Sequence, residues 1–283
     1  MELSHWWQLV DWTAPLRRPL YRAWPNLWKL HRDLRLEWQL RRWEREDRPR
    51  LEDARRREAA AYREEVEPLV TVCISTYHRS RLLVERCVPS VTAQTYRNLE
   101  ILVVGDHCTD ETEERMREIT DPRVRWFNLP QRPKLPANPV YQHRVTGSHP
   151  KNKALEMARG SWLAPLDDDD EFLPHHVASL LEYARAGDYE FVFAKQWGEG
   201  REGVWREIGR EGFATGRRPF NRCTIPLRTV MYRSYLRFMP FGCDIWRYGY
   251  CHDKILWERM ARAGVRAGFL DRVVARKHLA RRG

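Results

Sequence analysis

An apolar run that ends in five consecutive acids, Ser161-Trp-Leu-Ala-Pro-Leu-Asp-Asp-Asp-Asp-Glu171, restricts the fold more than any other stretch. Residues 162–166 predict a short buried strand, and Pro174 predicts the first turn of a new helix. We therefore expect the acids on a strand-to-helix loop, at the carboxyl end of the strand. Adjacent carboxylates repel by about 1 kcal/mol per pair in bulk water, so a partly buried cluster needs a compensating cation.

The acidic segment alone leaves two interpretations open. Its carboxylates suit Mg²⁺ or Mn²⁺, metals that keep ligand positions for substrate phosphates. The alternative is a solvated acidic turn that caps the next helix, because Asp is a favoured N-cap residue. The rest of the chain has to decide between them.

From residue 68 onward, buried strands alternate with helices. We expect strands at 69–75, 99–106, 123–127, 162–166, 189–194 and 266–275, and helices at 80–94, 109–121, 152–159, 174–186 and 253–263. A stretch rich in Pro and basic residues, at about 130–150, is expected to be a loop. This alternation predicts an α/β fold with a largely parallel sheet. In such a fold, ligands bind at the carboxyl ends of the strands.

Several polar residues fall at those carboxyl ends and indicate a nucleotide site. Tyr77 offers a ring for stacking, Asp106 can accept from a base N–H, and Lys151 can face a phosphate. Each has an ordinary alternative, as core filler, turn residue or surface charge. Their convergence with Thr76 and the acids of the 161–171 segment favours a bound nucleotide.

Residues 1–67 differ in kind from the rest and predict a helical extension rich in Trp and Arg, followed by a catalytic domain at 68–283. Seven of the 13 tryptophans lie in the first 43 positions, and residues 11–50 carry 11 basic against 6 acidic residues, a net +5. A long helix starting at Asn26 resembles an interfacial amphipathic helix that contacts an anionic membrane. The alternative is a helical hairpin packed on its own domain. We expect residues 50–66 to form a second, charged helix that acts as a solvated connector.

The net charge of +11 favours anionic partners without choosing among them. Six cysteines without C-x-x-C spacing, and no apolar signal peptide, lead us to expect a cytoplasmic protein, with the inner face of a membrane as its peripheral contact. No nucleic-acid reader motif is visible, so we expect no nucleic acid as partner.

The chain resembles the family 2 glycosyltransferases of GT-A fold over about residues 68–278. The matching pieces, in order, are Val70-Thr-Val-Cys-Ile-Ser-Thr-Tyr-His-Arg79, Val103-Val-Gly-Asp-His-Cys-Thr-Asp110, Lys151-Asn152 with Ala158-Arg-Gly160, Leu166-Asp-Asp-Asp-Asp-Glu171, and His252-Asp253 with Leu256-Trp257. Three of them depart from the usual family pattern. Gly105-Asp106 stands where the family usually has two aspartates. Lys151 replaces a common arginine, and His252-Asp253 replaces a Glu-Asp pair.

The resemblance implies an inverting, metal-dependent transfer of a hexose-type sugar from a nucleotide-diphosphate donor to a glycan or lipid-linked acceptor, in surface glycan or glycolipid synthesis. It implies Asp253 as the catalytic base and Mn²⁺ or Mg²⁺ as the cofactor. The metal is expected at Asp167, Asp169 and His278. Donor binding is expected at Thr76, Tyr77, Arg79, Asp106, Lys151, Asp167 and Asp168. The alternative function is a catalytically inactive GT-A module that acts as a binding or scaffold protein.

Overall fold

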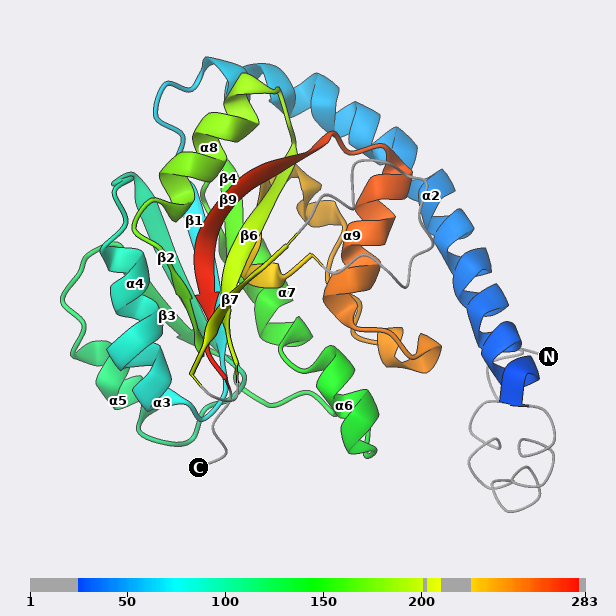
Figure 1. Ribbon diagram of the computed structural model, residues 1–283, viewed down its shortest axis with the longest axis horizontal. Coiled ribbons are helices and arrows are strands. Elements are labelled where there is room, and N and C mark those ends of the chain that lie inside the picture. Colours follow the sequence, from blue (N-terminus) through cyan, green and yellow to red (C-terminus); the bar gives the residue numbers. More distant parts are fainter. Residues whose placement is uncertain (1–24, 201–202, 210–224, 280–283) are drawn as a thin grey trace. The chain divides into compact units, whose positions relative to one another are not determined.

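The computed structural model describes residues 25–200, 203–209 and 225–279 (Figure 1). Two compact units divide the chain, residues 1–42 and residues 43–283. The second unit contains the whole sheet. Among the described residues, no helix is long and apolar enough to cross a bilayer.

Nine strands of the described chain form one mixed sheet, in the order β3-β2-β1-β4-β8-β6-β9-β5, with β7 paired to β6. Their bounds are β1 Val70–Thr76, β2 Leu99–Gly105, β3 Val124–Asn128, β4 Trp162–Asp167, β5 Asp170–Phe172, β6 Phe191–Glu199, β7 Trp205–Ile208, β8 Val230–Arg233 and β9 Ala267–Lys277. Strands β1, β2, β3, β4, β6 and β9 run in one direction, and β5, β7 and β8 run against them. The α/β class and the largely parallel sheet are therefore confirmed. The three antiparallel strands were not predicted, because runs of three or four residues carry too little periodicity.

Helices cover both faces of this sheet because alternate residues of each buried strand point to opposite sides. Cys73 and Leu102 face one apolar layer, which also contains residues of α7 and α9. Val72 and Ile101 face the other, which contains residues of η2, α4 and α8. The helices of this unit are α3 Ser80–Leu82, the π-helical turn η2 Leu83–Cys87, α4 Val88–Thr92, α5 Thr112–Arg117, α6 Pro139–Val145, α7 Ser148–Met157, α8 His176–Ala186 and α9 His252–Ala263. Short 3-10 turns add η4 Leu227–Thr229, η5 Ser234–Phe238 and η6 Ile245–Tyr248.

In the described part of the extension, one continuous helix, α2 Pro25–Glu64, spans the region where we expected a long helix followed by a second one. Pro49 lies inside it, although an internal proline costs a helix about 3 kcal/mol or more. Packing on both sides of Pro49 offsets that cost. Leu51 is fully buried with the core, and the fully buried Asp47 accepts a hydrogen bond from Arg259 Nη2 at 2.9 Å. The expectation of a solvated connector at 50–66 was therefore wrong.

The stretch at 130–150, expected as a loop, contains α6 and the start of α7. Asn138 caps α6 by accepting from the Val140 N–H at 2.9 Å, and Pro139 follows at the first helical position. Asn at the N-cap followed by Pro at the first helical position is a favoured way to begin a helix. Five described cysteines, Cys73, Cys87, Cys108, Cys243 and Cys251, are free thiols, and Cys223 lies outside the described residues.

Candidate active site

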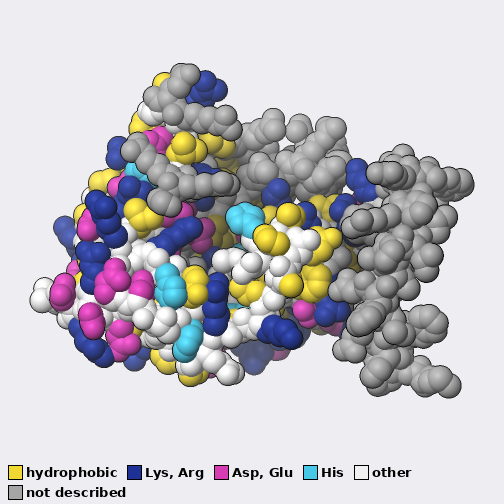
Figure 2. Space-filling view, turned by 90° about the horizontal axis from the view of Figure 1, so that it is seen from below, with side chains coloured by type: hydrophobic (Ala, Val, Ile, Leu, Met, Phe, Trp, Pro, Cys, Tyr) yellow, Lys and Arg dark blue, Asp and Glu magenta, His cyan; other side chains and the backbone are white. Residues whose placement is uncertain are grey.

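The six strands that run in one direction end at the same edge of the sheet, and the predicted site residues lie there. Thr76 ends β1, Asp106 follows β2, Asp167 ends β4, and His278 follows β9. Figure 2 looks onto this end of the molecule, where basic, acidic and histidine side chains gather on one face. The fold therefore brings together residues that lie up to 200 positions apart in the sequence.

Lysine and arginine neutralise the first three aspartates of the acidic segment. Lys151 Nζ lies 2.8 Å from Asp167 Oδ1, and Lys151 is itself buried. Arg79 bridges two carboxylates, with Nη1 at 3.2 Å from Asp168 Oδ1 and 2.7 Å from Asp169 Oδ2. The repulsion that the sequence predicted is thus compensated by a lysine of α7 and by an arginine at the start of α3.

The environments of Asp167 and Asp168 move their pKa values in opposite directions. Burial opposes ionisation of Asp167, but the Lys151 ammonium outweighs burial and lowers the pKa of this carboxyl to about 2. Burial dominates at Asp168 and raises its pKa to about 6, against the opposing charge of Arg79. Two adjacent carboxyls therefore differ in proton affinity because only one faces a buried ammonium.

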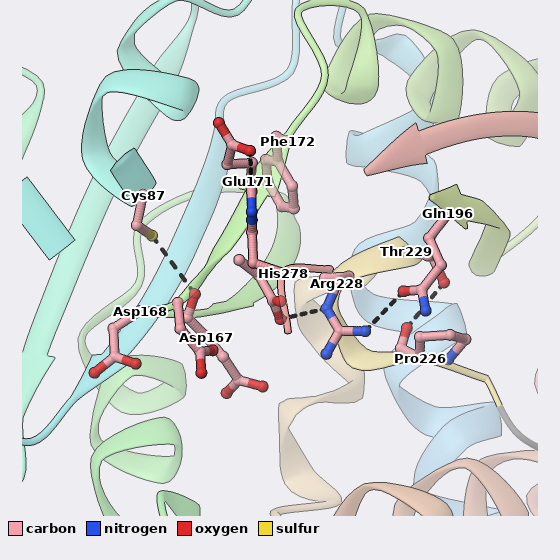
Figure 3. Close-up of polar contacts among 12 residues, drawn as sticks. Cys87, Asp167, Asp168, Glu171, Phe172, Gln196, Pro226, Arg228, Thr229 and His278 are labelled. Carbon is pink, nitrogen blue, oxygen red and sulfur yellow. Dashed lines mark hydrogen bonds and ion pairs between the residues drawn. The ribbon is translucent and has the colours of Figure 1, made fainter. Parts of the chain in front are cut away.

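Asp170 differs from the other three aspartates, because it belongs to the protein interior. It begins strand β5, together with Glu171, and Asp167 ends strand β4. The expectation that all the acids lie on a loop was therefore correct only for Asp168 and Asp169. Asp170 and Arg228 form a buried ion pair, and Arg228 Nη1 also donates to Gln196 Oε1 at 2.7 Å (Figure 3). The pair holds η4 against β5 and β6, a structural role.

A polar niche lies at the end of β2, beside Tyr77. Asp106 is buried, its Oδ1 has no hydrogen-bond partner among the described residues, and burial raises its pKa. Its Oδ2 accepts from Arg132 Nε at 3.4 Å. The hydroxyl of Thr76 is also enclosed without a partner in the described chain. Such orphaned polar atoms indicate a site for a ligand that carries donors and acceptors.

The ring of Tyr77 is covered on both faces, which the sequence did not predict. The Arg132 guanidinium lies 3.5 Å from the ring centroid, and the His78 ring stacks at 4.0 Å between centroids. Two groups this close to the centroid must lie on opposite faces. A base can stack directly on Tyr77 only after one of them moves.

One cavity of about 330 Å³ opens beside the acidic segment. It is lined by Arg79, Leu82, Arg86, Asp169, Glu199, His278 and Leu279. His278 Nε2 contacts the Glu171 carboxylate, and its Nδ1 lies 3.7 Å from Glu199 Oε2 (the contact with Glu171 is drawn in Figure 3). The predicted residues Arg79, Asp169 and His278 thus line a common space large enough for a small ligand.

Asp253 lies in the first turn of α9, as the sequence predicted. Its Oδ1 accepts from the Lys254 N–H at 2.8 Å. Burial raises the pKa of Asp253, and the charge of Asp167 raises it further. Its neighbour His252 is buried, and burial lowers the pKa of that imidazole to about 3, so His252 is neutral.

The donor set of the acidic segment suits a hard divalent metal. Within the described residues, no three His, Cys, Asp or Glu side chains converge as a complete protein cage. Mg²⁺ and related ions do not require one, because one or two carboxylates plus substrate phosphates commonly hold them. Asp169 is the partly exposed carboxylate that faces the cavity, with Asp167 two residues away.

Sequence reasoning missed three basic residues of this edge. Arg132 lies in the stretch that we expected as a loop, Arg86 belongs to a helix assigned to packing, and Arg228 precedes a short unpredicted strand. Of these three, only Arg86 could have been linked to the site from the sequence. Arg79, Leu82 and Arg86 follow i, i+3, i+7 spacing, which places them on one face of a helix.

Comparison with known proteins agrees with the resemblance seen in the sequence. The profile described as Glycosyl transferase family 2 matches residues 71–138 and 143–242, more than half of the chain. The chain belongs to this family of transferases. The fold and the sequence order of its site residues are consistent with that membership.

Individual relatives have low sequence identity to this chain, and the matches extend over only part of each relative's length. A GalNAc(5)-diNAcBac-PP-undecaprenol beta-1,3-glucosyltransferase of Campylobacter jejuni is 29% identical over 147 residues, which are 51% of this chain and 43% of that protein. An uncharacterized glycosyltransferase of Haemophilus influenzae is 24% identical over 224 residues, 73% of this chain and 64% of the relative. The chain therefore spans less than two thirds of the length of either relative.

Solved structures show the same fold at low sequence identity. S. aureus TarS 1-349 in complex with UDP-GlcNAc matches with a TM-score of 0.57 and 17% identity, over 76% of this chain and 59% of that one. The mannosyltransferase PcManGT from Pyrobaculum calidifontis, in complex with GDP-Man and Mn²⁺, matches with a TM-score of 0.55 and 16% identity, over 88% and 69%. The predicted GT-A fold is confirmed, and identities this low support the fold alone.

Proposed function

We propose that the protein is an inverting, metal-dependent glycosyltransferase that takes its sugar from a nucleotide-diphosphate donor. The observation that carries this proposal is the cavity shared by Arg79, Asp169 and His278. It lies at the same sheet edge as the orphaned carboxylate oxygen of Asp106. A nucleotide-diphosphate donor has groups that suit both places. Its base carries N–H groups that can donate to Asp106, and its charged diphosphate suits the cavity.

Asp253 acts as the general base in this proposal. The acceptor hydroxyl oxygen forms a bond to the anomeric carbon while the bond from that carbon to the diphosphate oxygen breaks. The hydroxyl proton passes to the Asp253 carboxylate, and the diphosphate leaves with the bonding electrons, so the anomeric configuration inverts. A raised pKa makes Asp253 a better proton acceptor than an ordinary surface carboxylate.

Asp169 and Asp167 are the proposed protein ligands of Mn²⁺ or Mg²⁺, with His278, which lines the same cavity as Asp169, as a further candidate. The metal would neutralise the negative charge that develops on the leaving diphosphate. Lys151 keeps Asp167 ionised, and an ionised carboxylate is the form that binds a cation. Metal use by PcManGT, whose structure contains Mn²⁺, supports the proposal.

The acceptor is proposed to be a glycan or a lipid-linked sugar at the inner face of a membrane. The named Campylobacter relative acts on a sugar linked to undecaprenol diphosphate, which supports a lipid-linked class. In α2, the side chains Leu30, Leu34 and Trp38 share one face and are 53%, 60% and 61% exposed. An exposed apolar stripe on an arginine-rich helix supports peripheral contact with an anionic bilayer.

Calorimetry tests the donor and metal parts of this proposal together. UDP, GDP, dTDP and their sugar forms are titrated into the full-length protein with Mn²⁺ and again with chelator. At least one of them should bind, and chelator should weaken binding by about tenfold or more. Equal affinity with and without metal would remove metal dependence, and no binding by any nucleotide would remove the donor class.

A further inference from the structure

One arginine that lines the cavity beside the acidic segment, Arg86, contacts no carboxylate of the described residues. Arg86 is half-buried and lines the cavity, and it has no hydrogen bond or ion pair to any residue in the described part of the chain. The other basic wall residues are already paired, Arg79 with Asp168 and Asp169, and His278 with Glu171 and Glu199. A half-buried guanidinium without an anion favours an anionic ligand in the same space.

The helix that carries Arg86 is fixed to the acidic strand, so the position of Arg86 is built into the site. Its π-helical turn, η2, ends at Cys87, whose Sγ donates to the Asp167 carbonyl at 3.6 Å (Figure 3). Leu83 and Cys87 of the same turn are fully buried. Extra turns of this type occur frequently at functional sites.

Arg79 bridges two carboxylates of the acidic segment. Its Nη1 contacts carboxylate oxygens of both Asp168 and Asp169, as a bridging cation would, and its own side chain is about half exposed. A metal bound at Asp169 and the Arg79 guanidinium compete for the same carboxylate. Arg79 precedes helix α3 and lines the same cavity as Arg86.

We infer that this cavity binds a diphosphate between Arg86 and Arg79, and that Arg79 exchanges from the aspartates to the diphosphate when the metal binds. In the free protein, Arg79 neutralises Asp168 and Asp169. When metal and diphosphate are bound, the metal neutralises these aspartates, and Arg79 and Arg86 both face the diphosphate. This inference rests on the proposed function for the source of the diphosphate, but its binding chemistry is testable without any sugar transfer.

The first experiment measures Mn²⁺ alone by calorimetry on the full-length protein. The variants are Arg79→Gln, Arg86→Gln and the control Arg81→Gln, which removes an exposed arginine of the same helix that pairs with Glu85 at 3.1 Å. Arg79→Gln should bind Mn²⁺ about three- to tenfold more tightly than the wild type, since its competitor is gone. The other two should match the wild type. The exchange is ruled out if Arg79→Gln binds Mn²⁺ no more tightly than the wild type does, or if neither protein binds Mn²⁺.

The second experiment titrates inorganic pyrophosphate in the presence of saturating Mn²⁺. Arg86→Gln should weaken pyrophosphate binding by about tenfold, and Arg86→Lys should retain part of the affinity. Arg81→Gln should bind as the wild type does, and thermal melting checks that every variant is folded. Equal pyrophosphate affinity in Arg86→Gln and Arg81→Gln overturns the diphosphate site.

A competition arm identifies the source of the diphosphate. If UDP or GDP displaces pyrophosphate, the cavity binds the donor diphosphate, which is the expected result. If pyrophosphate still binds to protein saturated with nucleotide, and still depends on Arg86, the cavity binds the diphosphate of an acceptor, which overturns the donor assignment. Failure of sugar transfer with intact pyrophosphate binding would count against the proposed function alone.

Discussion

Four consecutive aspartates of identical chemistry acquire different roles because each side chain meets a different neighbour. Asp167 faces Lys151, Asp168 and Asp169 share Arg79, and Asp170 is buried against Arg228. The sequence could locate these acids at the end of a strand. It could not separate the interior carboxylate from those of the site, because their partners come from distant parts of the chain.

At Asp253, a substitution can separate catalysis from donor binding and stability. Asn is nearly isosteric and can still accept the Lys254 N–H, so Asp253→Asn should leave melting temperature and nucleotide affinity nearly unchanged. It cannot accept a proton at neutral pH, and general-base catalysis contributes about 10²- to 10⁴-fold. Turnover, measured as nucleotide release with an acceptor present, should fall by that order.

Asp244 supplies the matched control for Asp253. Its side chain is 81% exposed and lies 3.8 Å from Arg247, so it belongs to the surface. Asp244→Asn should keep wild-type turnover within about twofold, as surface substitutions usually have small effects. If Asp244→Asn loses activity while Asp253→Asn keeps it, the base has been assigned to the wrong carboxylate.

At the scale of elements, the main strands and helices around the site were predictable, because a buried strand with a polar end appears in the sequence as an apolar run followed by polar residues. The prediction failed where tertiary packing overrides local signals. Helix α2 continues through Pro49 since Asp47 and Leu51 pack on the sheet domain, and strand β8 is only four residues long. Neither the ion pair of Asp47 nor the partner strands of β8 can be read from nearby sequence.

Arg55 of α2 provides a test of how strongly this helix is attached to the domain. Its Nε and Nη2 each donate to the buried Glu190 at 2.6 Å. Burial opposes ionisation of Glu190, but hydrogen bonds from Arg55 and Tyr235 outweigh it and lower the pKa of that carboxyl. Arg55→Met should lower the free energy of unfolding by about 3 kcal/mol at pH 7, because it removes the guanidinium that pairs with both oxygens of a buried carboxylate.

The pH dependence of that loss has a definite sign. A lowered pKa in the folded state stabilises the protein above the ordinary glutamate pKa, and this contribution disappears as the pH falls through the folded value. The difference between wild type and Arg55→Met, from urea unfolding, should therefore shrink below about pH 4.5. Arg57→Met, which breaks an exposed pair with Asp53 in the same helix, should cost less than about 0.5 kcal/mol. Equal losses in the two variants would contradict the attachment.

At the scale of the molecule, the boundary between extension and domain decides how membrane contact can be tested. Residues 43–283 form one compact unit, so a protein starting at Trp43 should remain folded. One starting at Pro68 would lose Asp47, Leu51 and Arg55 and should be markedly less stable. Thermal melting of the two proteins checks this difference, and equal melting temperatures would contradict it.

The protein starting at Trp43 then tests the extension. Full-length protein should sediment with vesicles that contain anionic lipid, and the truncated protein should remain in the supernatant, because the exposed Leu30, Leu34 and Trp38 are gone. Neutral vesicles are the control, since the arginines contribute only at an anionic surface. If full-length protein stays in the supernatant in both cases, the extension serves packing and the membrane proposal fails.

We propose that the acidic segment and a divalent metal act together to release the sugar from a sugar nucleotide. The most direct test measures release of the nucleoside diphosphate from a panel of sugar nucleotides, with Mn²⁺ or Mg²⁺ and with chelator, for wild type and Asp169→Asn. The account predicts release from at least one donor, its loss on chelation, and its loss in a folded Asp169→Asn. Release that persists in the variant or with chelator would contradict metal dependence, and no release from any donor would favour the inactive binding module.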